Sequence, residues 1–198
     1  MTLADRLRTA LALPPPPNLL AGDLADLPDA ELSSAAVLVA ITDRTEPGVH
    51  LTLRRENMRS HAGQVAFPGG RLDPGEDVIT AALREAKEEI GLPPASVELW
   101  GAADQYRTIT NFLVTPILGL VPPDLELSPH EHEVADLFEA PLSFVLDPAN
   151  QHRMSAMFRG ATRDYYQINW NGRRIWGATA AMLVNLTRRL EALESSTT

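Results

Sequence analysis

The sequence contains no cysteine. Disulfide frameworks, thiolate nucleophiles, cysteine-ligated zinc and iron–sulfur clusters are therefore excluded. Lysine is nearly absent too, because Lys87 is the single lysine among 17 basic residues. Since Lys87 follows Ala86 rather than a glycine, a phosphate-binding loop of the Gly-Lys-Ser/Thr type is excluded as well.

Long hydrophobic runs are also missing. No apolar stretch reaches the roughly 20 residues that a membrane-spanning helix needs, and residues 1–8 lack the basic and apolar regions of a secretory signal. We therefore expect a cytoplasmic protein without a membrane partner. The net charge of −9 argues against nucleic acid as a partner. An anionic small molecule stays open as a substrate, because a metal ion or a local arginine cluster can reverse the field in one cleft.

The length of 198 residues indicates one domain with a small extension. Leu3, Leu7 and Leu11 recur at helical spacing, and Pro14–Pro17 ends that helix in a stiff connector. We expect residues 1–32 to form this helix and proline-rich connector, and residues 33–194 to form the main domain.

The main domain reads as a set of strands placed around one central helix. Strands are expected at 35–41, 49–54, 65–67, 97–103, 111–120, 133–138, 154–158, 165–170 and 174–176, and helices at 77–90, 142–146 and 178–193. Because helices and strands do not alternate strictly, this order favours an α+β fold with a mixed sheet over a doubly wound parallel sheet.

The helix over 77–90 is the most informative segment. Its expected core stripe comprises Ile79, Leu83, Ala86 and Ile90. On another face, Glu85, Glu88 and Glu89 fall within about 100° of one another. Glu85 and Glu89 are like charges one turn apart, which destabilises a bare helix by about 0.2–0.5 kcal/mol. A hard divalent cation would compensate, and Arg84 can pair with Glu88. A merely solvated acidic face is the alternative for these glutamates taken alone.

The wider segment resembles the signature of Nudix hydrolases, Gly-x5-Glu-x7-Arg-Glu-U-x-Glu-Glu-x-Gly-U, where U is a bulky aliphatic residue. The matching residues are Gly70, Glu76, Arg84, Glu85, Glu88, Glu89, Gly91 and Leu92. Ala86 stands at the first U position and is the one departure.

This resemblance implies a hydrolase acting on a nucleoside diphosphate linked to another moiety, with an α/β/α sandwich fold and Mg²⁺ or Mn²⁺ as cofactor. By position in the signature, the implied metal ligands are Glu85, Glu89, Glu88 (directly or through water) and the carbonyl of Gly70. Arg84 would orient the glutamates. Glu76 would fix the loop rather than bind metal, and Glu88 is also open as the group that activates water.

A second motif precedes the signature. It is similar to the one that marks the coenzyme A pyrophosphatase branch, Leu-Leu-Thr-x-Arg-(Ser/Ala)-x3-Arg-x3-Gly-x3-Phe-Pro-Gly-Gly. The matches are Leu51, Thr52, Arg54, Arg59, Gly63 and Phe67–Gly70. His50 and Arg55 depart from it. The implied reaction splits coenzyme A, or an acyl or oxidised form, into 3′,5′-ADP and the 4′-phosphopantetheine part.

Arg54 and Arg59 are the candidate substrate-binding residues, because arginine pairs well with phosphate. A solvated basic loop is the alternative. Glu133 lies where Nudix proteins often supply a further acidic residue for metal or base. His130 and His132 are interpreted as surface residues, because two histidines without further ligands are weak evidence for zinc.

Other readings stay open at this point. The substrate can instead be ADP-ribose, NADH, a dinucleoside polyphosphate or a damaged nucleotide. A Nudix-fold binding or sensor domain without turnover is the alternative from another class. A homodimer is compatible with the sequence, and neither the general base nor the preferred form of coenzyme A is fixed by it.

Overall fold

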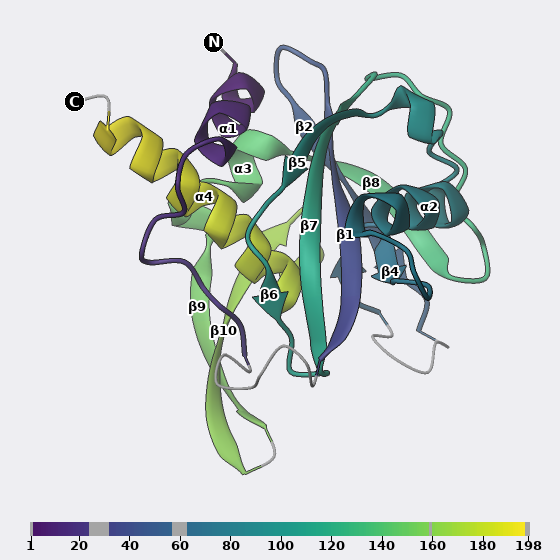
Figure 1. Ribbon diagram of the computed structural model, residues 1–198. Coiled ribbons are helices and arrows are strands. Elements are labelled where there is room, and N and C mark those ends of the chain that lie inside the picture. The colour runs from purple at the N-terminus through teal and green to yellow at the C-terminus, as the bar shows by residue number, and fades with distance from the viewer. Residues whose placement is uncertain (1, 24–31, 57–62, 159, 197–198) are drawn as a thin grey trace.

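We analysed a computed structural model, which describes residues 2–23, 32–56, 63–158 and 160–196 (Figure 1). The helices are α1 (Leu3–Leu11), α2 (Val78–Ile90), α3 (Leu142–Val145) and α4 (Ala178–Ser196), with short 3-10 turns at Pro94–Ser96 and Pro148–Asn150. The strands are β1 (Ser33–Thr42), β2 (Gly48–Arg54), β3 (Val65–Ala66), β4 (Gly69–Arg71), β5 (Glu98–Ala102), β6 (Tyr106–Arg107), β7 (Phe112–Val121), β8 (Val134–Pro141), β9 (His152–Phe158), β10 (Ala161–Trp170) and β11 (Arg173–Trp176).

Eight of the described strands form one mixed sheet. Its main path runs β3-β2-β1-β7-β5, with β4 paired to β1, β6 to β7 and β8 to β2. The central pair β1–β7 is parallel and the other pairs are antiparallel. A second sheet of three strands, β11-β10-β9, extends from the body as a long hairpin (Figure 1).

Helices cover both faces of the large sheet. Helix α2 lies on one side, and α4 lies with α1 and α3 on the other (Figure 1). Two hydrophobic clusters fill the spaces on either side of the sheet. This is the α/β/α sandwich with a mixed sheet that the sequence predicts.

The N-terminal helix belongs to the larger of these two clusters. Leu7 of α1 is fully buried, and Arg189 of α4 donates hydrogen bonds to the carbonyl oxygens of Ala10 and Leu13. Arg6 also forms an ion pair with Glu194 near the end of α4. The described part of the N-terminal segment is thus packed on the main body, while the boundary drawn between residues 32 and 33 stays a prediction.

Helix α2 begins and ends where its local chemistry predicts. The carboxylate of Asp77 accepts hydrogen bonds from the backbone N–H groups of Ile79 and Thr80, and Gly91 ends the helix with a φ of 70°. Such a left-handed residue is favourable for glycine, which has no Cβ to clash.

The expected core stripe of α2 is partly wrong. Ala86 and Ile90 are buried, but Ile79 is 37% exposed and Leu83 is only half-buried. The buried positions are instead Ala81, Ala82, Ala86, Glu89 and Ile90. Small alanines allow the helix to lie close to β1 and β4, which turns Glu89 inward and leaves the larger Ile79 outside.

The short strands β4 and β6, which pair with β1 and β7, were not expected from the sequence. A separate irregularity lies where β2 pairs with β8. At the end of β2 the pairing with β8 shifts register, so that Leu53 faces Asp136 whereas Arg54 faces Val134. A bulge of this kind redirects the neighbouring side chains. No helix in the described residues is long and apolar enough to cross a membrane.

Candidate active site

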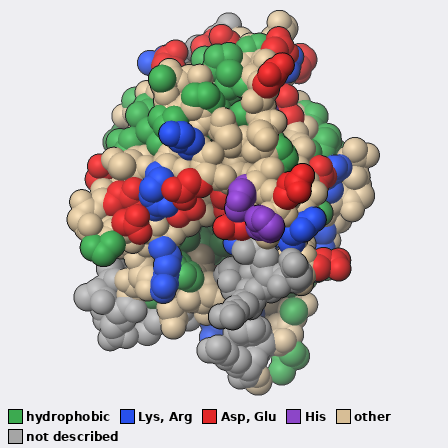
Figure 2. All heavy atoms as spheres, turned by 90° about the vertical axis from the view of Figure 1, so that its right-hand side faces the viewer, with side chains coloured by type: hydrophobic (Ala, Val, Ile, Leu, Met, Phe, Trp, Pro, Cys, Tyr) green, Lys and Arg blue, Asp and Glu red, His purple; other side chains and the backbone are tan. Residues whose placement is uncertain are grey.

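Three of the four signature glutamates line a cavity of about 310 Å³ beside α2. Its lining consists of Glu85, Glu88, Glu89, His130 and Glu133. Figure 2 shows acidic side chains, interspersed with basic ones, gathered on this face of the molecule. Two segments build the cavity: α2 supplies three glutamates, and the segment before β8 supplies the other two residues.

Glu89 is the most buried of these acids, with 4% of its surface exposed. Arg54 Nη1 donates to Glu89 Oε1 over 3.1 Å, and the Gly69 N–H donates to Glu89 Oε2 over 3.1 Å. Burial raises the pKa of Glu89 to about 7, although Arg54 and the Gly69 N–H oppose this shift. Desolvation of the charged form therefore outweighs the ion pair here.

Arg84 is the centre of a hydrogen-bond network at the outer edge of the cavity. Its guanidinium donates to Glu76 through Nε and Nη2, each over 2.9 Å, and to the carbonyl of Arg71 over 3.0 Å. Its Nη1 reaches Glu85 Oε1 at 3.0 Å and Glu88 Oε2 at 3.2 Å. Hydrogen bonds from Arg84 hold the pKa of Glu76 below its usual value.

Arg84 and Arg54 explain how α2 accommodates two like charges one turn apart. Glu85 pairs with Arg84 and Glu89 pairs with Arg54, so each of the two like-charged carboxylates has its own counter-ion. Burial nevertheless raises the pKa of Glu85, against the influence of Arg84.

Gly70 lies directly against the Glu85 carboxylate. A Cβ placed on Gly70 would lie 2.4 Å from Glu85 Oε1 and 2.6 Å from Glu85 Cδ. The absence of a side chain at Gly70 therefore allows the backbone of β4 to approach the acidic face of α2 closely. Only a glycine at position 70 leaves the present position of Glu85 free.

The segment before β8 is fixed to the end of α2 by its backbone. The His130 N–H donates to the Glu89 carbonyl over 2.8 Å, and the His130 carbonyl accepts from the N–H groups of Glu133 and Val134. The Arg55 N–H donates to the Glu133 carbonyl over 3.1 Å. This bonding brings Glu133 to the cavity, together with His130.

The other candidates are distributed as follows. Arg54 reaches the cavity through Glu89, whereas Arg55 is exposed. Arg59 lies outside the described residues. His132 is exposed and contacts the His130 ring edge-on at 5.4 Å. His130 is exposed, as expected of a surface residue, and it also lines the cavity, because the fold brings its loop to α2.

The donor set around the cavity suits a hard divalent cation, since carboxylate and carbonyl oxygens are the ligands that Mg²⁺ prefers. The clearance at Gly70 leaves room for the Glu85 carboxylate beside a backbone carbonyl. Within the described residues, no three acidic or imidazole side chains already converge on one point. The reason is visible in the contacts, because Glu85 and Glu88 turn toward Arg84 and Glu89 turns toward Arg54.

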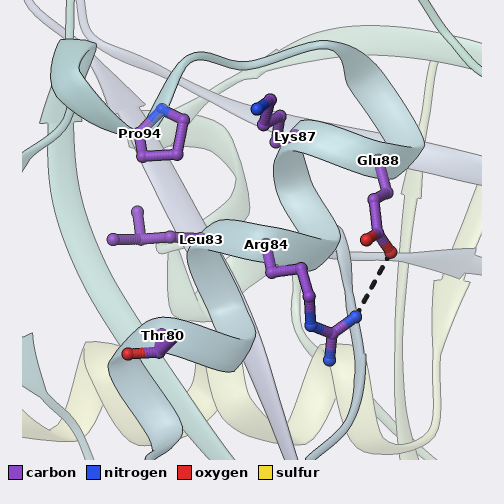
Figure 3. Close-up of a pocket in the computed structure, with 6 residues that line it drawn as sticks. All are labelled: Thr80, Leu83, Arg84, Lys87, Glu88 and Pro94. Carbon is purple, nitrogen blue, oxygen red and sulfur yellow. Dashed lines mark hydrogen bonds and ion pairs between the residues drawn. The ribbon is translucent and has the colours of Figure 1, made fainter. Parts of the chain in front are cut away.

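A second hollow of about 500 Å³ lies on the outer side of α2 (Figure 3). It is lined by Thr80, Leu83, Arg84, Lys87, Glu88 and Pro94. The dashed pair in Figure 3 is Arg84 with Glu88, which border this hollow on the side of the acidic cavity. Half-buried Leu83 thus lines this hollow and also packs against the hydrophobic cluster between α2 and the sheet.

Sequence comparison identifies the family of the chain. The NUDIX domain family matches residues 32–159. An uncharacterized Nudix hydrolase, NudL, from Citrobacter koseri is 41% identical over 157 residues, which cover 79% of this chain and 82% of the relative. The protein of the same name from Photorhabdus laumondii is 39% identical over 185 residues, covering 93% of this chain and 95% of the relative.

Solved structures agree with this assignment at the level of the fold. The Nudix hydrolase RenU from M. smegmatis superposes with a TM-score of 0.54 at 20% identity, covering 84% of this chain and 88% of its own. A MutT/nudix family protein from Enterococcus faecalis gives a TM-score of 0.50 at 14% identity, covering 97% of this chain and 70% of its own. With the signature residues gathered at one acidic cavity and relatives that share most of the chain, this protein belongs to the Nudix hydrolase family.

Proposed function

We propose that this Nudix hydrolase cleaves the pyrophosphate bond of coenzyme A, or of an acyl or oxidised form, with Mg²⁺ or Mn²⁺ as cofactor. One observation carries the proposal: the contact between Arg54 and Glu89 joins the upstream motif to the signature helix at a single cavity. The products would be 3′,5′-ADP and the 4′-phosphopantetheine part.

The metal would be held by Glu85, Glu89 and Glu88, with the carbonyl of Gly70 as a further donor. When bound, a divalent cation neutralises charge on the pyrophosphate oxygens as the bond breaks. Arg84 would orient the glutamates, and Glu76 would hold Arg84 and the loop in place. Glu88 and Glu133 both border the cavity, so either can orient the attacking water or accept its proton.

Recognition of the substrate would rest on arginines of the upstream motif. Arg54 pairs with Glu89 of the cavity lining, and within the described contacts its buried Nε has no hydrogen-bond partner. A guanidinium has five N–H donors, so Arg54 can contact a phosphate oxygen with those that Glu89 does not use. Arg59 is proposed to receive the 3′-phosphate.

The decisive experiment is a product assay. Purified protein is incubated with Mg²⁺ or Mn²⁺ and with coenzyme A, ADP-ribose, NADH or a dinucleoside polyphosphate, and the products are read by mass spectrometry. The highest kcat/KM for coenzyme A, with the two expected products, supports the proposal. A preference for another substrate keeps the Nudix site and rejects the coenzyme A specificity.

Two variants refine this assay. Glu89→Gln should remain folded and lose most turnover, and normal activity in the folded variant would reject the metal assignment. Arg59→Ala should raise KM for coenzyme A more than for dephospho-coenzyme A. Equal effects on both substrates would remove the role of Arg59 at the 3′-phosphate.

The remaining expectations stay predictions. They are a cytoplasmic location, the absence of nucleic-acid and membrane partners, and the possibility of a homodimer.

A further inference from the structure

The contacts of Arg54 point to a role that precedes substrate binding. Arg54 lies at the end of β2, and Glu89 lies in the last turn of α2. Arg54 Nη1 and Glu89 Oε1 are 3.1 Å apart, and the side chain of Glu89 is almost completely removed from solvent. A buried carboxylate of this kind needs a positive partner close by.

The backbone holds Arg54 at this position. Its N–H donates to the Gln64 carbonyl over 2.9 Å, and its carbonyl accepts from the Gly63 N–H over 3.1 Å. The register shift between β2 and β8 occurs at this same residue. The sheet therefore holds the backbone of Arg54 where its guanidinium contacts Glu89.

Glu89 has two oxygens, and both are engaged. Oε2 accepts from the N–H of Gly69, the first residue of β4, and Oε1 accepts from Arg54. A cation that uses Glu89 as a ligand must therefore share or take the oxygen that Arg54 now holds. Two positive groups at one carboxylate oxygen repel each other, so their binding is mutually opposed.

We propose that Arg54 is a built-in counter-ion of Glu89, which occupies the carboxylate in the metal-free protein and is displaced when the divalent cation binds. Arg54 is a positioning residue in this role, since it acts through Glu89. The proposal rests on the proposed metal function of Glu89. It also explains why the acidic side chains of the cavity do not converge in the described structure. Once released, the guanidinium would stay beside the cavity with more donors free for a phosphate.

The test compares thermal unfolding with and without metal. Wild type, Arg54→Met and Arg55→Met are scanned by calorimetry in EDTA and in saturating Mg²⁺ or Mn²⁺. Arg55 is the matched control, because it is the next residue and its side chain is exposed. At pH 8, above the pKa of Glu89, Arg54→Met without metal should unfold about 5–10 °C below wild type, because the ionised Glu89 loses its partner.

Metal should then restore much of this loss. The metal-induced rise in Tm is expected to be at least about 4 °C larger in Arg54→Met than in wild type or Arg55→Met. In a Glu89→Gln background the Arg54→Met substitution should not enlarge the rise. If Arg54→Met does not fold in EDTA, recovery of folded protein only on refolding with metal is the expected result.

An equal or smaller rise in Arg54→Met overturns the counter-ion role while leaving the metal function in place. Failure of Arg54→Met to refold in either condition overturns it as well. If wild type itself shows no rise with either metal, the metal function fails and this inference fails with it.

Discussion

Glu76 and Arg84 stand eight residues apart and form two parallel hydrogen bonds, from Nε to Oε1 and from Nη2 to Oε2, each 2.9 Å long. The second Glu76 oxygen also accepts from the Asp73 N–H over 2.9 Å. Both carboxylate oxygens of Glu76 are thereby engaged in hydrogen bonds to the loop and to Arg84. This geometry agrees with a role in fixing the loop, as proposed, and it leaves Glu85 and Glu88 as the acids of the cavity lining that pair with Arg84.

Replacing Arg84 with lysine should impair the enzyme although the charge is kept. A lysine has a single ammonium and cannot make the paired bonds to Glu76 while also reaching Glu85. We expect kcat to fall by about 10- to 100-fold, the range usual for residues that orient metal ligands. Steady-state kinetics on Arg84→Lys, with Arg153→Lys as a control at an exposed ion pair, measure this. A wild-type rate in Arg84→Lys would show that the forked geometry is dispensable.

Gly70→Ala should separate stability from activity. The new Cβ would collide with the Glu85 carboxylate, which is the far end of a flexible side chain and can rotate away. Unfolding should therefore change little, whereas the Mg²⁺ concentration for half-maximal activity should rise by about tenfold or more.

Gly75→Ala in the same loop is the matched control for Gly70→Ala. Gly75 has a φ of 83° and no atom within 4 Å of a built Cβ, so alanine there is strained but clashes with nothing. It should lower stability by about 1 kcal/mol and leave metal activation unchanged. If Gly75→Ala and Gly70→Ala affect metal activation equally, the close approach of Gly70 to Glu85 is not needed for metal activation.

Much of the fold was predictable because its signals are local. The N-cap at Asp77, the C-terminal Gly91 and the apolar runs of the central strands are each set by a short stretch of chain. The buried face of α2 was not predictable in the same way. Hydrophobicity favours Ile79 for the core, but the closeness of β1 and β4 favours alanines, and that closeness depends on the glycines of β4.

In the candidate site, too, some features follow from the local sequence and others depend on how the chain folds. The spacing of Glu85, Glu88 and Glu89 could be read from one helical turn and its neighbours. The counter-ion of Glu89 could not, since Arg54 precedes it by 35 residues and reaches it only through the pairing of β2 in the sheet. The position of His130 beside the cavity could not be read from the sequence for the same reason, since its loop joins the site through a backbone hydrogen bond to Glu89.

The two neighbouring histidines should differ in their effect on turnover. His130 lines the acidic cavity, whereas His132 contacts the His130 ring and is not among the residues that line the cavity. His130→Ala should lower kcat/KM by about tenfold, because an imidazole at the cavity can donate a hydrogen bond to an anionic substrate. His132→Ala should stay within about twofold of wild type. Equal kinetics for the two variants would show that His130 does not contribute to substrate binding or turnover.

The pKa of Glu89 predicts a pH dependence of stability in the metal-free protein. Its pKa rises from 4.5 to about 7 on folding, so between these values the folded chain holds a proton that the unfolded chain has released. Stability from this group is therefore complete below pH 4.5 and is lost as the pH rises through 7. The loss amounts to roughly 3 kcal/mol at most.

Glu89→Gln isolates this effect, because glutamine keeps the size of the side chain and does not titrate. Urea unfolding in EDTA should show wild type losing stability relative to Glu89→Gln as the pH is raised from 4.5 to 7.5. Saturating Mg²⁺ should suppress that relative loss, since a bound cation favours the ionised carboxylate. If wild type instead gains stability relative to Glu89→Gln over this range, the Arg54 ion pair outweighs burial, and Glu89 is ionised in the fold well below neutral pH.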